Sequence, residues 1–169
     1  MTETKEFNVP FSKEVASRYG GETVMLCYQC GTCASSCPVA KTTEKFNPRE
    51  IFRLVLLGER QEVFQSNAIW LCSSCYNCQE RCPQMVELVD VFFALRNIAA
   101  KEGHLPKIYS EFAFALMNDG RIVPVSKFIE RKREQIGLPP LKTIGTEALR
   151  KILAVTGFDK LLLKKEVES

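Results

Sequence analysis

The chain has 169 residues, of which 46% are hydrophobic and 25% are charged, and its formal net charge is +3. This size and composition are typical of a globular protein with one domain and at most an appended segment. The most apolar stretch, residues 85–100, is interrupted by Glu87, Asp90 and Arg96. We therefore expect no quinone-binding anchor and no membrane span, which would need roughly 18 uncharged apolar residues.

Residues 1–23 are predicted to form an N-terminal arm without chemical function. Ser12 is the expected N-cap of a brief helix that ends by Ser17, before Gly20 and Gly21. The first residues, MTETKEFNVPFSKE, contain no apolar stretch like that of a signal peptide. We therefore expect a cytoplasmic protein.

Two copies of the motif C-x2-C-x2-C-x3-C-P contain all eight cysteines of the chain. In two-cluster ferredoxins with this motif, three cysteines of one copy bind a [4Fe–4S] cluster and the fourth binds the other cluster. The prolines Pro38 and Pro83 favour this arrangement because each biases the preceding cysteine toward an extended conformation. The predicted ligands are Cys27, Cys30, Cys33 and Cys82 for cluster 1, and Cys72, Cys75, Cys78 and Cys37 for cluster 2.

Disulfides and structural zinc are the two alternatives for these cysteines. Disulfide frameworks belong to secreted chains, and no signal peptide is evident. Structural zinc usually takes two C-x2-C pairs separated by a longer spacer, so a third cysteine in each loop suits it poorly. We therefore favour two [4Fe–4S] clusters. Because every cysteine is then a ligand, we expect no catalytic residue in the chain.

The segment between the motifs determines the predicted fold. It carries two helical patterns, whereas β-rich two-cluster ferredoxins have short β-branched stretches there. Asn47-Pro48-Arg49-Glu50 is a strong helix start, with an N-cap, a first-turn proline and a capping-box glutamate. A second helix is expected from Glu59 to Gln65. A long helix is expected from Val86 to Lys101, with Gly103 as the residue that stops it. The predicted fold class is all-α, with the cluster-binding domain at residues 24–103.

Residues near the cysteines are expected to adjust the clusters. Small and polar loop residues are candidate hydrogen-bond donors to sulfur, which raise a cluster's potential: Gly31, Thr32, Ser73, Ser74 and Asn77. Apolar side chains are expected to limit the access of water: Phe46, Phe52, Trp70 and Phe92. The two loops are too alike in sequence to indicate a direction of electron flow.

Residues 104–169 are predicted to form a helical extension that docks on another subunit. Helical patterns span Lys107–Asn118, Ser126–Gln135 and Thr146–Ala154. Residues 121–169 contain 11 Lys/Arg against 6 Asp/Glu, whereas residues 1–120 contain 12 against 14. Because the basic residues are spread over amphipathic patterns and match no nucleic-acid-binding motif, we expect a partner surface or solvated faces, and no nucleic acid.

The chain resembles the two-cluster iron–sulfur subunit of heterodisulfide reductase, its C subunit, over about residues 24–102. The resemblance rests on both cysteine motifs, from Cys27-Tyr28-Gln29-Cys30 to Cys82-Pro83, and on Asn47-Pro48-Arg49-Glu50 between them. It implies an α-helical ferredoxin with two [4Fe–4S] clusters. In that family the protein passes electrons from a flavin-containing subunit to a catalytic CCG-domain subunit, which reduces the coenzyme M–coenzyme B heterodisulfide in methanogenic archaea. Such complexes also join a hydrogenase or formate dehydrogenase and couple by flavin-based electron bifurcation.

Related families fit less well. Iron–sulfur subunits of succinate dehydrogenase carry a further [2Fe–2S] domain, which needs cysteines that this chain lacks. The anaerobic glycerol-3-phosphate dehydrogenase subunit resembles a fusion with cysteine-rich CCG domains, which are also absent from this sequence. Three alternatives to the relay stay open: a subunit of a related sulfur-metabolising complex, a diffusing ferredoxin-like carrier, and a protein whose clusters only stabilise the fold.

Overall fold

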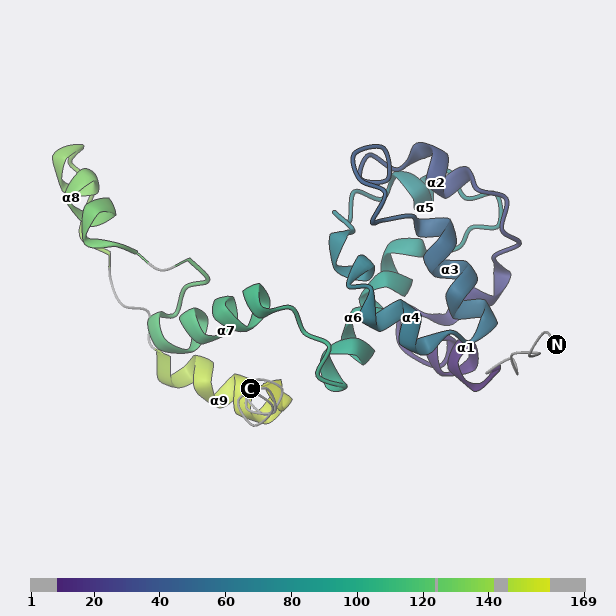
Figure 1. The fold of residues 1–169 in the computed structure, drawn as a ribbon. Coiled ribbons are helices and arrows are strands. Elements are labelled where there is room, and N and C mark those ends of the chain that lie inside the picture. The colour runs from purple at the N-terminus through teal and green to yellow at the C-terminus, as the bar shows by residue number, and fades with distance from the viewer. Residues whose placement is uncertain (1–8, 124, 142–145, 159–169) are drawn as a thin grey trace. The chain divides into compact units, whose positions relative to one another are not determined.

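The computed structural model describes residues 9–123, 125–141 and 146–158, and these residues form helices and no β-strand (Figure 1). The all-α prediction is therefore confirmed. The chain divides into two compact units, residues 1–104 and residues 105–169. The first unit contains α1 (Val9–Ala16), the 3₁₀ helix η1 (Glu22–Leu26), α2 (Thr32–Ser36), α3 (Pro48–Leu57), α4 (Arg60–Gln65), the 3₁₀ helix η2 (Ala68–Leu71), α5 (Asn77–Glu80) and α6 (Leu88–Lys101).

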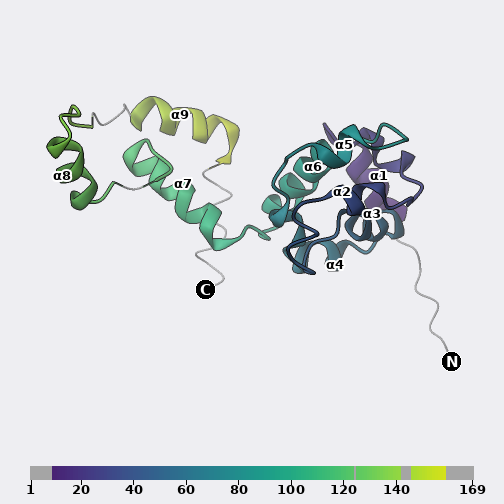
Figure 2. The same cartoon turned by 90° about the horizontal axis from the view of Figure 1, so that it is seen from above.

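The first unit contains the same order of elements twice. α1, η1, α2 and α3 accompany the first cysteine motif, and α4, η2, α5 and α6 accompany the second. The short helices α2 and α5, which begin inside the two motifs, pack against each other and lie side by side in both views (Figures 1 and 2). The repeat in the sequence is thus a repeat in the structure, and it brings the two motifs together.

Helix α3 begins as its sequence predicts. The Asn47 side chain accepts a hydrogen bond from the backbone N–H of Glu50 (3.3 Å), and Pro48 occupies the first turn. Gly58 ends the helix with φ +82°, a conformation that favours glycine. The next helix, α4, covers residues 60–65, within one residue of the prediction.

Helix α6 forms the centre of the first unit. Its buried residues occupy more than one stripe, as predicted: Leu88, Val89, Val91, Phe92, Ala94, Leu95, Ile98 and Ala99. Phe93 is the exception, with 43% of its surface exposed. The helix begins at Leu88, two residues later than expected. Before it, the backbone N–H of Glu87 donates to Thr23 Oγ1 (2.9 Å) and so ties this turn to the segment after α1.

Residues 9–23 differ from the predicted arm. Helix α1 already includes Ser12, which is 2% exposed and inside the helix, so its prediction as an N-cap is wrong. Phe11 and Val15 are buried in the core, and the Phe11 ring meets Phe64 of α4 edge to face, with centroids 5.5 Å apart. The helix is too short for its apolar spacing to stand out in the sequence. Residues 1–8 of the predicted arm lie outside the described residues.

An arginine fastens α1 to the rest of the first unit. Arg60, at the start of α4, forms an ion pair with Glu14 of α1 (Nη1 to Oε2, 2.6 Å) and another with Glu102 at the end of α6. Its guanidinium also lies 5.0 Å from the centroid of the Phe11 ring. Hydrogen bonding from Arg60 is the main reason why the pKa of Glu14 is lowered.

The second unit contains α7 (Lys107–Asp119), α8 (Lys127–Gln135) and α9 (Thr146–Thr156), so the three predicted helices are confirmed within two residues. α7 packs against α9, and Arg150 Nε donates to the Met117 carbonyl (3.2 Å). In the described ranges of both units, no helix is long and apolar enough to cross a membrane.

Candidate metal centres

The eight cysteines line two pockets of the first unit. The first pocket is lined by Cys27, Cys30, Cys33 and Cys82. The second pocket is lined by Cys37, Cys72, Cys75 and Cys78. Each pocket therefore takes three cysteines from one motif and the fourth from the other. These are the two groups of four that the motif spacing predicts as ligand sets.

Each loop curls around its pocket by the same pair of backbone turns. The residues two and four positions after the first cysteine have positive φ in both loops: Gln29 (+67°) and Gly31 (+87°), then Ser74 (+52°) and Tyr76 (+63°). The left-handed conformation costs a non-glycine residue about 1–2 kcal/mol. Three of the four positions bear this cost, which indicates that the curl of the loop is required by the site.

The second cysteine of each motif, Cys30 or Cys75, is exposed. The two buried thiols, Cys37 and Cys78, both belong to the second pocket. Burial is the main reason why the pKa of Cys33 is raised to about 11 and that of Cys78 to about 12. Every thiol must lose its proton to act as a ligand, and burial makes this loss hardest for Cys33 and Cys78.

The pockets fit a polynuclear cluster better than a single ion. In the described part of the chain, no three His, Cys, Asp or Glu side chains are arranged to hold one metal ion. Four thiols around a space, without convergence on one point, suit a cluster whose thiolates bind iron atoms at separate corners.

Several groups donate to the cysteine sulfurs. In the first pocket the Gln29 amide donates to Cys27 Sγ (3.4 Å), and Val86 N–H donates to Cys82 Sγ (3.4 Å). Cys30 Sγ and Thr32 Oγ1 lie 3.3 Å apart, and this contact is the main reason why the pKa of Cys30 is lowered. In the second pocket, Ala40 N–H donates to Cys37 Sγ (3.5 Å).

Of the donors predicted from the sequence, Thr32 lies within hydrogen-bond distance of a sulfur, although here the Cys30 thiol donates to the Thr32 hydroxyl. Gly31 and Ser73 line the pockets, and Ser74 forms part of the curl of its loop. Asn77 begins α5. Gln29 was not predicted, because nothing in the sequence distinguishes it from the other residues between paired cysteines.

Two arginines hold the loops from neighbouring helices. Arg49 of α3 donates from Nε to the Gln29 carbonyl (3.0 Å) and lines the first pocket. Arg96 of α6 donates from Nε to the Ile69 carbonyl (2.9 Å) and from Nη2 to the Cys72 carbonyl (2.7 Å). Neither was predicted as a site residue, although Arg49 belongs to the helix-start motif.

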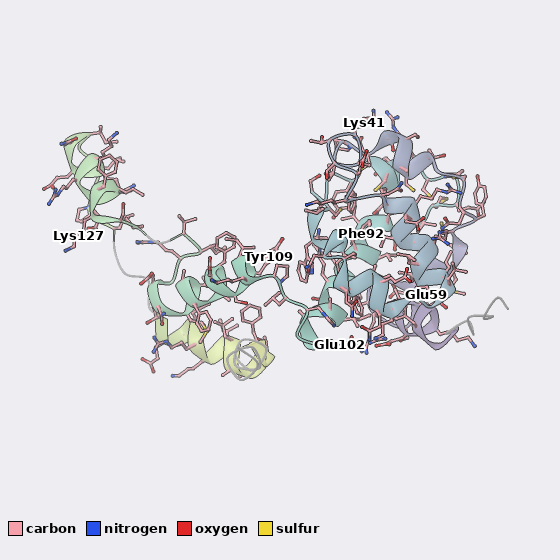
Figure 3. All side chains as sticks on the ribbon, viewed as in Figure 1. Lys41, Glu59, Phe92, Glu102, Tyr109 and Lys127 are labelled. Carbon is pink, nitrogen blue, oxygen red and sulfur yellow. The ribbon has the colours of Figure 1, made fainter. Side chains whose placement is uncertain are left out.

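Aromatic residues form the walls of the second pocket. Phe46 and Phe92 line it directly, and Phe52 packs on Phe92 with ring centroids 5.7 Å apart. Figure 3 shows Phe92 inside the first unit, where it is 1% exposed. Trp70 differs from the prediction, because it lines neither pocket and instead faces the Arg96 guanidinium at 5.8 Å.

Comparison with known proteins agrees with this chemistry. Residues 23–86 match a family described as a 4Fe-4S dicluster domain. The chain therefore carries two [4Fe–4S] clusters, and the pockets above offer eight thiols for them.

Curated relatives cover most of the chain. It is 40% identical to the iron-sulfur C subunit of the CoB–CoM heterodisulfide reductase of Methanopyrus kandleri, over 83% of this chain and 76% of the relative. It is 37% identical to the C subunit of the H(2):CoB-CoM heterodisulfide,ferredoxin reductase of Methanothermobacter thermautotrophicus, over 90% and 84%. It is 34% identical to the C subunit of the ferredoxin:CoB-CoM heterodisulfide reductase of Methanosarcina mazei, over 86% and 92%. The chain thus belongs to the family of the iron–sulfur C subunits of heterodisulfide reductase.

Proposed function

We propose that this chain is the electron-relay subunit of a heterodisulfide reductase complex. It receives electrons from a flavin-containing partner and delivers them to a CCG-domain partner, which reduces the coenzyme M–coenzyme B heterodisulfide. Cys27, Cys30, Cys33 and Cys82 would hold cluster 1, and Cys72, Cys75, Cys78 and Cys37 would hold cluster 2. When bound, each cluster supplies reversible one-electron chemistry.

One observation carries this proposal: all eight thiols of the chain are gathered in two pockets whose helices α2 and α5 pack together. The chain's own residues position the sulfurs, donate hydrogen bonds to them and exclude water on the side of Phe46 and Phe92. A relay needs these properties, whereas the breaking of a substrate disulfide would need a further reactive group, which we assign to the CCG-domain partner.

The second unit supports assembly with other subunits. α8 carries Lys127, Arg131, Lys132 and Arg133 against two glutamates. Phe128 on the same helix is 65% exposed, and Lys132 lies 5.1 Å from the centroid of its ring. Such a mixed surface fits an acidic partner with an apolar depression. We propose that residues 105–169 dock the chain on its complex, which extends in some systems to a hydrogenase or formate dehydrogenase.

The site of this reaction is proposed to be the cytoplasm. Eight thiols that bind iron must stay reduced, and reducing compartments keep them so.

The test is anaerobic purification of the chain from its native host, with iron and sulfide analysis, low-temperature EPR after reduction, and identification of the co-purifying subunits. We expect eight irons with [4Fe–4S] signals, together with a flavoprotein and a CCG-domain protein. Eight irons without partners would favour a diffusing carrier. Clusters that cannot be reduced reversibly in the complex would favour a purely structural role.

The proposed ligand sets are tested by Cys27→Ser and Cys75→Ser, each of which should impair one cluster and stop electron transfer. Ser35→Ala is the matched control, because Ser35 lies between the cysteines of the first motif, lines neither pocket and donates to the Thr32 carbonyl (2.9 Å). Full turnover by either cysteine variant with one cluster missing would contradict the relay.

A further inference from the structure

The two pockets differ in the side chains that contact their sulfurs. The Gln29 amide and the Thr32 hydroxyl serve the first pocket, at 3.4 Å from Cys27 Sγ and 3.3 Å from Cys30 Sγ. An iron-bound thiolate has no proton, so Thr32 must be the donor in the loaded protein. Within the described residues, the second pocket has the backbone donor Ala40 and no side-chain donor to sulfur.

The thiols of the two pockets differ in burial. Cys37 and Cys78 of the second pocket are buried, whereas no thiol of the first pocket is. Both pockets have apolar walls, with Pro83, Val86 and Leu88 in the first and Phe46, Val89 and Phe92 in the second. A charge in the second pocket therefore lies farther from water.

Each loop is bound by one arginine. Arg49 donates to the backbone of the first loop and Arg96 to the backbone of the second, so these two cations partly offset each other when the pockets are compared. Arg49 also lines the first pocket, where its charge favours a reduced cluster. The side-chain donors and the burial of the thiols add to this asymmetry.

Reduction adds one negative charge to a cluster and its four thiolates. Hydrogen bonds to the sulfurs stabilise this charge and raise the reduction potential, whereas an apolar surrounding lowers it. The effect of a donor is larger where the contact is shielded from water, as for the part-buried Gln29 and Cys27, than at the exposed Cys30. Both differences between the pockets therefore favour reduction at the first.

We infer that cluster 1 has the higher reduction potential, set by Gln29 and Thr32, so that electrons enter this chain at cluster 2 and leave it from cluster 1. The inference rests on the proposed relay function and adds its direction. In the internal step one electron leaves cluster 2 and one arrives at cluster 1. No bond is formed or broken, and no proton moves.

The test is an EPR-monitored redox titration of the full-length protein, purified with its complex, for wild type, Gln29→Leu and Thr32→Val. We expect two reduction steps in wild type. Each variant should lower the potential of the higher step by up to about 59 mV, which is a tenfold change in a one-electron reduction equilibrium. The potential of the lower step should stay unchanged. Thr32→Ser retains the hydroxyl and should therefore retain the wild-type potential. If Thr32 only filled space, loss of its methyl group in this variant would shift the potential as well.

Matched controls come from the equivalent positions of the second loop. Ser74→Ala and Asn77→Ala correspond to Gln29 and Thr32, and we expect neither to move the higher step. A shift of the lower step in Gln29→Leu, or unchanged potentials in both first-loop variants with eight irons bound, would overturn the inference. Wild-type protein without eight irons would instead contradict the proposed function itself, so the two failures are distinguishable.

Discussion

The two units of the chain use their apolar residues in opposite ways. In the first unit, Phe11, Phe46, Phe52, Phe64 and Phe92 are each at most 2% exposed. Among the described residues of the second unit, the buried apolar residues are Ala113 and Leu153, whereas Phe112, Phe114 and Phe128 are 36–65% exposed. The first unit closes a core around its cluster pockets, and the second leaves apolar area for another surface. Stability and assembly are thus assigned to different parts of one chain.

Removal of iron should have the largest effect, and it should act on the first unit. Both pockets lie there, and their cysteines pack with the core, so the bound clusters contribute directly to its folding. We expect chelation under reducing conditions to abolish the cooperative unfolding transition of this unit, measured by circular dichroism. An iron-free protein with wild-type helix content and melting temperature would contradict this expectation.

Phe92→Ala should destabilise the first unit by about 3–5 kcal/mol, because it leaves a cavity between Phe46 and Phe52 in a closed core. The matched control is Phe128→Ala in α8, where the exposed ring should contribute at most about 0.5 kcal/mol. Denaturant unfolding of both variants measures the difference. Equal losses would show that the second unit also depends on a core of its own.

Loss of a helix cap should have a smaller effect. Asn47→Ala removes the acceptor for the Glu50 N–H and should cost the first unit about 1 kcal/mol of unfolding free energy. Ser126→Ala removes the equivalent cap of α8, because the Ser126 hydroxyl accepts a hydrogen bond from the Ile129 N–H. We expect this control to lower helix content without changing the unfolding of the first unit, and a matching loss in both variants would weaken the comparison.

The smallest effect concerns pH and the Glu14–Arg60 ion pair. Because the folded protein lowers the pKa of Glu14, the pair stabilises the fold above the ordinary pKa of 4.5 and loses this contribution as pH falls through the lowered value. Its partial exposure limits the contribution to less than about 1 kcal/mol. The difference in unfolding free energy between wild type and Glu14→Gln should therefore shrink from pH 7 to pH 4.

The control for this pH dependence is Glu147→Gln in α9. Its ion pair with Lys151 is far more exposed, at 86% for the glutamate side chain. We expect the substitution to change the unfolding free energy little, since solvent screens such a pair. If Glu147→Gln showed a pH dependence as large as that of Glu14→Gln, the effect at Glu14 would not arise from its contact with Arg60.

Most of the fold could be predicted from local signals. Asn47, Pro48 and Gly58 mark both ends of α3, and Ser126 marks the start of α8, because caps act within one turn of the chain. A brief helix was predicted at α1, but its start and its place in the core were not, because they depend on contacts of Phe11 and Val15 with distant residues, such as Phe64. Helix α1 is the first element of the first copy, as α4 is of the second, and this correspondence is evident only in the folded structure.

The site was predictable in its cysteines and less so in their neighbours. Motif spacing separates the thiols into the two groups that line the pockets. Arg96 lies 24 residues from Cys72, and Arg49 lies 20 residues from Gln29. No local pattern links residues at such separations, so these contacts require the packing of α3 and α6. The asymmetry between the loops is local but still needs the folded loop to be seen, since Gln29 and Ser74 occupy equivalent positions and only the longer Gln29 side chain contacts a sulfur.

The exchange of the fourth cysteine between pockets has a consequence for biosynthesis. The first pocket needs Cys82, and the second needs three cysteines of the later motif. While the ribosome has released only the first half of the repeat, neither pocket has all its walls. Iron delivered at that moment would meet at most three of the four thiols of the first pocket. Cluster insertion therefore belongs to a late stage, after both halves have emerged, and a prematurely terminated chain is left without a complete site.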